Sequence, residues 1–303
     1  MEQPLVSLIV PVYNVAPWLE RCLDSVAAQS WENIEILLVD DGSTDGSADL
    51  CAAWAARDRR FRVLRQANAG VSAARNLGLS HAGGQYLQFV DGDDFLPPDA
   101  TEALVRTAAS TGADLVVGRF WRVAGSRAAL QGHIREERVL TRQDYAEEML
   151  KAPANFYYGV LWNKLYRRSL VEAGRLRFDP DVSWCEDFLF NLEYLRRARL
   201  IAACARPVYC YVKRPGSLVS TQLTPARTVE MKREVFAAYK NLYQALDLYE
   251  EKKLQVYGYL LSAARDGGSI SLTRPRRRRR QGKVKETFMS RSQSVHQPQG
   301  EVE

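Results

Sequence analysis

The stretch Tyr86-Leu-Gln-Phe-Val-Asp-Gly-Asp-Asp-Phe95 predicts a strand that ends in an acidic turn. Its apolar-rich part, Tyr86 to Val90, predicts a buried strand, and Asp91, Asp93 and Asp94 follow directly. Three carboxylates in four residues repel one another, so a folded protein keeps them together where positive charge compensates. Mg²⁺ and Mn²⁺ often bind one or two carboxylates together with the oxygens of a bound phosphate. The stretch alone leaves two interpretations open, a metal site or an acidic turn that leads into a helix.

Length and composition are those of an ordinary globular protein. The chain has 303 residues, of which 46% are hydrophobic and 26% charged, enough to bury a substantial core. Its formal net charge of +6 is dominated by the segment from Arg274 to Lys285, which holds eight basic residues. The rest of the chain is therefore near neutral, which argues against a general nucleic-acid binder.

The cysteines and the apolar runs bear on the cellular compartment. The five cysteines form an odd, scattered set without a Cys-x-x-Cys pair, which favours reduced thiols over a disulfide framework or a zinc site. Residues 5–12 have the length of a strand and follow no basic residue, unlike a signal peptide. No run approaches the roughly 20 apolar residues of a membrane span. We therefore expect a soluble, cytoplasmic protein.

Strands and helices are predicted to alternate over the first hundred residues. Apolar runs predict strands, and helices with an apolar stripe are predicted between them. The predicted strands are residues 5–10, 34–39, 61–64 and 86–90, and the predicted helices start at Pro17, near residue 47 with Ser43 or Asp45 as N-cap, and at residue 73. This alternation is typical of right-handed βαβ units, so the predicted fold class is α/β with a doubly wound, mostly parallel sheet.

The pattern loosens after a strand at residues 114–118. Residues 119–139 fit either a hairpin or an irregular excursion, and Thr141 with Asp144 predicts a capped helix. Further predictions are a helix at 159–167, a helix from 183 to about 198, short strands at 201–204 and 208–212, one or two amphipathic helices at 225–264, and a disordered tail of about 35 residues.

Four polar segments are predicted to meet at one edge of the sheet. They are residues 11–14, 40–47, 68–76 and 91–94, and each follows a predicted strand. Strand ends and the neighbouring helix N-termini can receive a nucleotide there, because backbone N–H groups and the helix dipole favour phosphate. No G-x-G-x-x-G follows the first strand and no G-x-x-x-x-G-K-[ST] occurs, which argues against dinucleotide binding and P-loop hydrolysis.

These segments carry a resemblance to a known family. With Pro11-Val-Tyr-Asn14, Val39-Asp-Asp-Gly-Ser-Thr-Asp45, Asn68-x-Gly-Val-Ser-x-Ala-Arg-Asn-x-Gly78 and Asp91-Gly-Asp-Asp94, in this order, the chain resembles the family 2 glycosyltransferases of GT-A fold. Residues 161–166, 186–187 and 214–218 are similar to the bacterial capsule and exopolysaccharide members. The resemblance covers about residues 4 to 220.

The resemblance implies inverting transfer of a sugar from a nucleotide diphospho-sugar, most often a UDP-sugar, to an acceptor hydroxyl in surface polysaccharide synthesis. By position, Pro11, Tyr13 and Asp41 are expected to frame the base, with Asp41 accepting from a uracil N–H. Arg75 is expected near the base or the diphosphate.

The same resemblance implies a metal and a general base. Asp93 is expected to ligate Mn²⁺ or Mg²⁺, and Asp91 to contact the ribose or the metal's water shell. A metal there would neutralise the charge that develops on the leaving nucleotide diphosphate. Asp187 is expected to be the general base that takes the acceptor proton. Two structural alternatives compete: Ser183-x-x-Glu186 fits a capping box, and Asp187 could serve the helix dipole.

Other polar residues are weaker candidates. Arg214 or Ser217 could close over the diphosphate, whereas Asn68 and Asn76 are expected to brace turns. His133 and Trp162 are expected to be a surface histidine and a core residue. The further site candidates are Asp40, Asn68, Asp94, Glu186, Arg214 and Ser217.

The resemblance divides the chain into a nucleotide-sugar-binding half (1–118), an acceptor-side half (119–220), a helical extension (221–264) and a basic tail (265–303). The run Arg276 to Arg280 could hold the enzyme peripherally at an anionic membrane, which would suit a lipid-linked sugar acceptor. Two alternatives remain at this stage. One is a sugar nucleotidyltransferase, which would need a basic, glycine-rich loop after the first strand; the other is a nucleotide-sugar-binding scaffold or sensor without turnover.

Overall fold

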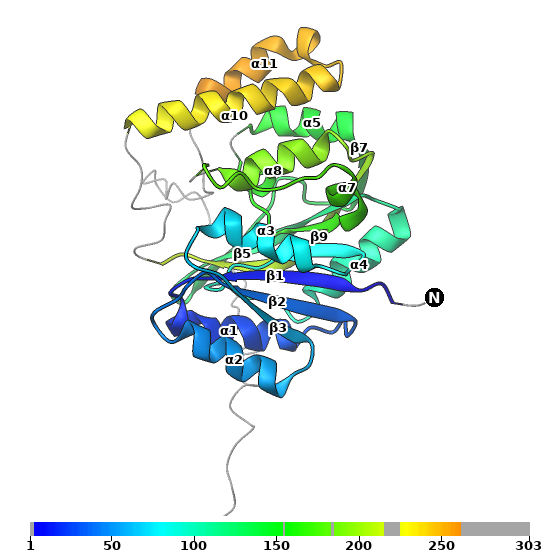
Figure 1. Cartoon of the computed structure of the whole chain (residues 1–303). Helices are drawn as coiled ribbons and strands as arrows, with labels where there is room; N and C mark the ends of the chain where they lie inside the picture. Colours follow the sequence, from blue (N-terminus) through cyan, green and yellow to red (C-terminus); the bar gives the residue numbers. More distant parts are fainter. Residues whose placement is uncertain (1–2, 154, 183–184, 215–224, 262–303) are drawn as a thin grey trace, which may run out of the picture. The chain divides into compact units, whose positions relative to one another are not determined.

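Four parallel strands form one end of a nine-stranded mixed sheet (Figure 1). β1 (Val6–Val12) lies between β2 (Ile34–Asp40) and β4 (Tyr86–Phe89), and β3 (Phe61–Arg65) pairs with the outer side of β2. The strand order is β3-β2-β1-β4-β8-β5-β9-β7, with β6 paired to β5. β1 and β2 are buried almost throughout, as expected for parallel strands covered on both faces.

This computed structural model describes residues 3–153, 155–182, 185–214 and 225–261. All of them belong to one unit that ends at Gly268. The predicted basic tail and residue 217 lie outside the described residues, as do residues 262–264 of the predicted helical region.

Helices cover both faces of the parallel strands. α1 (Ala16–Ala27) and α2 (Ser47–Arg57) lie on one face, and α3 (Val71–His81) lies on the other, against β1 and β2 (Figure 1). α4 (Ala100–Thr111) packs against β5, β8 and β9. This arrangement confirms the predicted α/β class with a mostly parallel sheet.

The second half of the sheet mixes directions. β8 (Lys164–Arg167) runs antiparallel between β4 and β5 (Leu115–Ala124), and β5 pairs in parallel with β9 (Leu200–Val212). β6 (Arg127–Gln131) forms a hairpin with β5, so the hairpin alternative holds for residues 119–139. β7 (Arg138–Thr141) lies antiparallel to β9.

α5 packs on β7 and β9, and the C-terminal helices form a further layer. α10 packs on α8, and α11 packs on α10 and α5 (Figure 1). Ring contacts join Phe188 of α8 to Tyr239 and Tyr259 of the two C-terminal helices. No helix of the described part is long and apolar enough to cross a membrane. The bounds are α5 (Arg142–Lys151), α6 (Phe156–Gly159), α7 (Arg168–Ala173), α8 (Glu186–Leu195), α10 (Pro225–Ala245) and α11 (Tyr249–Leu261).

Several local predictions are confirmed. The Thr141 hydroxyl accepts from the Asp144 backbone N–H while the Asp144 carboxylate accepts from the Thr141 N–H, which is the predicted capping box. The C-terminal region forms two helices. The helix predicted from residue 183 begins at Glu186 in the described part of the chain, and residues 183 and 184 lie outside it.

Two predictions in the second half are wrong. Residues 159–167 are not a helix: α6 ends at Gly159 and the chain turns into β8 at Lys164. Residues 160–166 are all buried, so the pattern of hydrophobic residues showed no period that separates helix from strand. The short strands at 201–204 and 208–212 are one strand, β9, whose register against β5 shifts near Arg119.

α3 packs so closely on β1 that we expect position 78 to accept only glycine. A β-carbon on Gly78 would lie 2.5 Å from Cγ2 of Ile9. We expect Gly78→Ala to lower the free energy of unfolding by about 1–3 kcal/mol through overpacking, measured by denaturant titration.

The matched control is Gly258→Ala, because a β-carbon at that helical position meets nothing within 4 Å. It should be neutral or should raise stability by up to about 1 kcal/mol. Equal effects of the two substitutions would contradict the packing of α3 described here.

Candidate active site

The polar segments that follow β1 and β2 bind one another. The backbone N–H of Asn14 donates to the Ser43 hydroxyl (3.2 Å), and the N–H of Thr44 donates to the Asn14 side-chain oxygen (2.8 Å). The Asp45 carboxylate accepts from the N–H groups of Ala16 and Ser47, at the starts of α1 and α2. Gly46, not Ser43 or Asp45, occupies the N-cap position of α2, but the Asp45 carboxylate still caps both helices.

Asp41 holds the loop that leads into α3. Its carboxylate is 3% exposed, and Oδ1 accepts from the Ala69 N–H (2.9 Å) and the Gln66 amide (2.7 Å). Oδ2 accepts from the Gly70 N–H (2.9 Å). Asn68 is exposed in this loop. Asp41 therefore braces the loop, and Oδ2 keeps a lone pair for a further donor.

Asp40, Pro11 and Tyr13 surround the same strand ends. Asp40 is buried and accepts from the Ser43 N–H (3.0 Å). Pro11, the second-last residue of β1, lies next to the acidic turn, since a β-carbon on Gly92 would lie 3.3 Å from the Pro11 carbonyl oxygen. Tyr13 is 49% exposed, so its ring offers a flat apolar surface at the edge of the sheet.

Asp94 clamps the acidic turn to β9. Its Oδ1 accepts from the Val212 N–H (2.7 Å), and the Cys210 N–H donates to the carbonyl of Phe95 (2.9 Å). Burial, followed by the charges of Asp93 and Asp91, raises the pKa of Asp94 well above its ordinary value. This environment gives Asp94 a structural role.

Asp93 is paired with an arginine beyond the end of β9. Arg214 contacts Asp93 Oδ2 through Nε (2.6 Å) and Nη2 (2.5 Å), and its guanidinium lies 4.1 Å from the ring centroid of Trp18. The Asp94 clamp sets this contact, because Val212 lies two residues before Arg214. Ser217, the other residue predicted to close over the site, lies outside the described residues.

No group of three or more His, Cys, Asp or Glu side chains that could hold a metal ion occurs among the described residues. Mg²⁺ and Mn²⁺ need fewer protein ligands where a substrate supplies phosphate oxygens. Asp91 and Asp93 on one turn are hard oxygen donors of that kind. The residues therefore fit a metal shared with a phosphate-bearing ligand.

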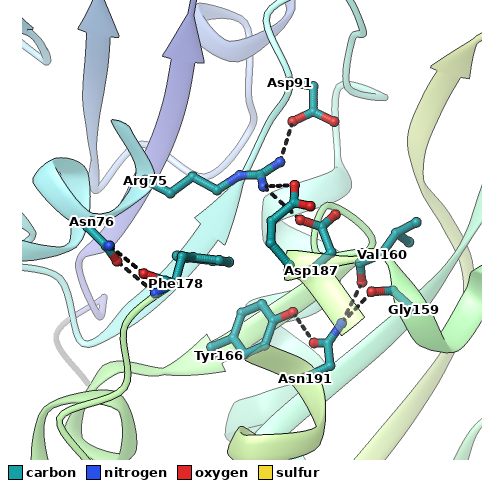
Figure 2. A network of polar contacts seen from close by, with 10 residues as sticks. Arg75, Asn76, Asp91, Gly159, Val160, Tyr166, Phe178, Asp187 and Asn191 are labelled. Atoms are coloured by element: carbon teal, nitrogen blue, oxygen red, sulfur yellow. Dashed lines mark hydrogen bonds and ion pairs between the residues drawn. The ribbon is translucent and has the colours of Figure 1, made fainter. Parts of the chain in front are cut away.

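A single arginine joins three carboxylates (Figure 2). Nη2 of Arg75 contacts Asp91 (3.3 Å), and Nη1 contacts both Glu186 (2.9 Å) and Asp187 (2.7 Å). Arg75 is 4% exposed and lies over the Phe178 ring at 5.5 Å. The predicted general base is thus brought to the turn after β4 by a residue of α3. The expectation that Arg75 contacts the base or diphosphate stays untested, and its observed partners are carboxylates.

The cluster perturbs two of its acids. Withdrawal from water raises the pKa of Asp187, whose side chain is 21% exposed; Arg75 opposes the rise, and Glu186 and Asp91 reinforce it. Withdrawal from water is also the main reason why the pKa of Asp91 is raised. Burial is the largest cause for both acids, and the opposing charge of Arg75 does not cancel it.

Glu186 and Asp187 occupy the first turn of α8. Cys185, with φ 64°, is the N-cap residue of α8, so Glu186 is the first helical residue and its carboxylate binds Arg75. The predicted capping box needs Ser183, which lies outside the described residues, as does Trp184. The helix-dipole alternative for Asp187 stays open beside its contact with Arg75.

The sequence reasoning missed two buried polar residues that position the site. The Asn191 amide of α8 donates to the carbonyl of Gly159 (2.7 Å), and its oxygen accepts from the Tyr166 hydroxyl (2.7 Å) (Figure 2). The Tyr209 hydroxyl accepts from the Asp91 backbone N–H (3.0 Å). An asparagine within the apolar run of α8 was a usable signal, because a buried amide requires partners.

The remaining predictions concern bracing residues. Asn76 braces a distant segment and not a turn: its amide donates to the Phe178 carbonyl (2.7 Å) and its oxygen accepts from the Phe178 N–H (2.8 Å). Trp162 is in the core, stacked on Tyr209 at 4.3 Å. His133 is half-buried and hydrogen-bonded to the Tyr158 hydroxyl, so it is not a free surface histidine.

Several known proteins have sequences similar to that of this chain. The model of the family described as Glycosyl transferase family 2 matches residues 7–175. The chain is 37% identical over 243 residues to the uncharacterized glycosyltransferase EpsJ of Bacillus subtilis, covering 79% of this chain and 71% of that protein. It is 34% identical over 274 residues to the glycosyltransferase GlyA of Streptococcus pneumoniae, covering 88% of this chain and 38% of that protein.

Solved structures share the fold. TarS 1–349 of S. aureus in complex with UDP-GlcNAc superposes with a TM-score of 0.67 at 21% identity, over 84% of this chain and 79% of that chain. The mannosyltransferase PcManGT of Pyrobaculum calidifontis in complex with GDP-Man and Mn²⁺ gives a TM-score of 0.51 at 20% identity, over 88% and 77%. Because the family model spans more than half of the chain and the relatives exceed 30% identity, this protein belongs to glycosyl transferase family 2 and is a glycosyltransferase of GT-A fold.

Proposed function

We propose that this enzyme transfers a sugar with inversion from a nucleotide diphospho-sugar, with UDP-sugars favoured, to an acceptor hydroxyl in surface polysaccharide synthesis. The observation that carries the proposal is the shared Arg75, which holds Asp187 beside Asp91 at the strand ends. In the reaction the acceptor oxygen bonds to the anomeric carbon while its proton passes to Asp187. The bond from that carbon to the diphosphate breaks, and its electron pair stays on the leaving phosphate oxygen.

The donor's base is proposed to lie at the ends of β1 and β2. The exposed ring of Tyr13 offers a stacking surface, and Pro11 lies on the same strand end. Asp41 Oδ2 has one hydrogen bond from the described protein, so it can accept a second one from a uracil N–H. The binding of UDP and UDP-GlcNAc by the structural neighbour TarS supports a uridine donor.

Asp93 and Asp91 are proposed to bind Mn²⁺ or Mg²⁺ together with the donor's diphosphate. A bound metal would neutralise the charge that develops on the leaving diphosphate. Asp93, which pairs with Arg214 in this structure, would hold the metal when the donor is bound. Arg214 would then be free to contact the diphosphate, which lies beside the same carboxylate.

A second function, a nucleotide-sugar-binding scaffold or sensor, would use the same donor site without turnover. The perturbed Asp187 favours the enzyme, because a scaffold does not need a carboxyl group with a raised pKa beside the donor site. Peripheral contact of the basic tail with an anionic membrane belongs to the proposal for a lipid-linked acceptor, and the residues concerned lie outside the described part.

Asp93→Ala should abolish metal-dependent nucleotide binding, because it removes the carboxylate proposed to bridge metal and diphosphate. The measurement is calorimetric titration with UDP, GDP and TDP, each with Mn²⁺ and with EDTA. Asp24→Ala, a substitution of an exposed aspartate on α1, is the control and should bind like the native protein. Equal UDP binding in Mn²⁺ and EDTA would argue against the metal.

Asp187→Asn should lower kcat by about 10²–10⁴-fold while leaving the Kd for UDP with Mn²⁺ unchanged. Asparagine keeps an oxygen for the Arg75 contact but cannot take a proton. The readout is UDP release from UDP-GlcNAc, UDP-glucose and UDP-galactose with water as acceptor. Full turnover by the variant would exclude Asp187 as the base.

The reaction should slow as the pH falls through the pKa of Asp187. Burial, with Glu186 and Asp91 nearby, raises this pKa above 3.8, and Arg75 and Lys164 oppose the rise. Below the pKa the carboxyl holds a proton and cannot act as base; above it the base is available. The pH profile of kcat should therefore show an acidic limb above the ordinary carboxyl range, and Asp187→Asn should abolish that limb.

A further inference from the structure

Arg75 connects three elements that are distant in the sequence. It lies on α3, and its partners lie on the turn after β4 and on the first turn of α8. The guanidinium lies between the Asp91 carboxylate on one side and Asp187 of α8 on the other (Figure 2). The carboxylate on the turn after β4 and the two carboxylates of α8 therefore contact the same rigid guanidinium.

We propose that Arg75 is a positioning residue that sets the separation and orientation of Asp187 relative to the donor-side Asp91, and that it is not a ligand of the donor. This inference rests on the proposed function, since it takes Asp187 as the base and Asp91 as a donor-side residue.

The shape of the side chain supports this role. A guanidinium is planar and presents its N–H groups in a fixed fork, so partners on Nη1 and Nη2 are held at set directions from one another. Nη1 of Arg75 donates to Asp187 Oδ1, so Oδ2 is the oxygen that we propose takes the acceptor proton. A lysine ammonium carries the same charge on a flexible stem and cannot impose this geometry.

The contacts of its two terminal nitrogens argue against donor binding by Arg75. Nη1 already contacts Glu186 and Asp187, and Nη2 already contacts Asp91, so a ligand would have to compete with these acids. A phosphate that reached Arg75 would displace one of these acids and leave it buried without a partner, which is costly.

The next residue in the chain fixes the platform beneath Arg75. The two hydrogen bonds of Asn76 to the Phe178 backbone hold that ring under the guanidinium. Phe178 in turn stacks on Phe190 of α8, with ring centroids 4.4 Å apart. Two consecutive residues of α3 thus fix the base-bearing helix, one through its acids and one through the loop that packs on it.

The test is Arg75→Lys, measured by kcat for UDP release from UDP-GlcNAc and by the Kd for UDP with Mn²⁺. We expect kcat to fall by about 100-fold, as small displacements of reacting groups produce, while Kd changes by less than about 3-fold. Arg60→Lys is the control, since Arg60 makes a bidentate pair with Asp58 away from the site and should leave both constants unchanged.

A double-mutant cycle separates positioning from an independent role. In the Asp187→Asn background, Arg75→Lys should lower kcat by less than about 3-fold, because the group that it positions is already inactive. Multiplicative effects, or a Kd weakened by about 10-fold or more, would overturn the inference. Full activity of Asp187→Asn alone would instead refute the proposed base, so the two failures are distinguishable.

If thermal unfolding shows that Arg75→Lys is not folded, Asn76→Ala takes its place. This variant keeps Arg75 and removes the brace on Phe178. It should lower kcat by about 10-fold with Kd for UDP unchanged, whereas an unchanged kcat or a parallel loss of UDP binding would contradict the proposed positioning by α3.

Discussion

Like charges gathered at the carboxyl ends of the strands are the constraint on which the site depends. Asp91, Asp93 and Asp187 converge there, and two arginines from different parts of the chain compensate them. Arg75 comes from α3 and Arg214 from beyond the end of β9. Each arginine joins segments that are more than fifteen residues apart. The acids are therefore neutralised only when these segments pack together in the folded protein.

The two arginines differ in what surrounds them. Arg75 is enclosed by protein and joined to three acids, which suits a group that keeps its place through the reaction. Arg214 lies at the edge of the site, and its carboxylate partner is the one proposed to bind a metal. In the proposed mechanism, Arg75 would be the fixed cation beside the base and Arg214 an exchangeable cation beside the donor.

The sequence predicted the parallel half well because local signals agreed there. Near-continuous apolar runs predicted β1, β2 and β4, and polar residues at their ends marked the site. It failed at 159–167, where the burial of all residues from 160 to 166 left no period, and at β9, where Pro207 and an irregular register concealed one long strand. The partners of Arg75 could not be predicted, since Glu186 and Asp187 lie 111 and 112 residues further along the chain.

The contacts of α3 differ in how much sequence they demand of the other half. Asn76 binds only the backbone of residue 178, so this brace accepts many side chains at that position. Arg75 instead requires acidic side chains at the start of α8. Consider a chimera that joins the first half of this chain to the second half of a relative. The hydrogen bonds of Asn76 would form with almost any relative, whereas the contacts of Arg75 would form only with relatives that carry acidic residues at the start of α8.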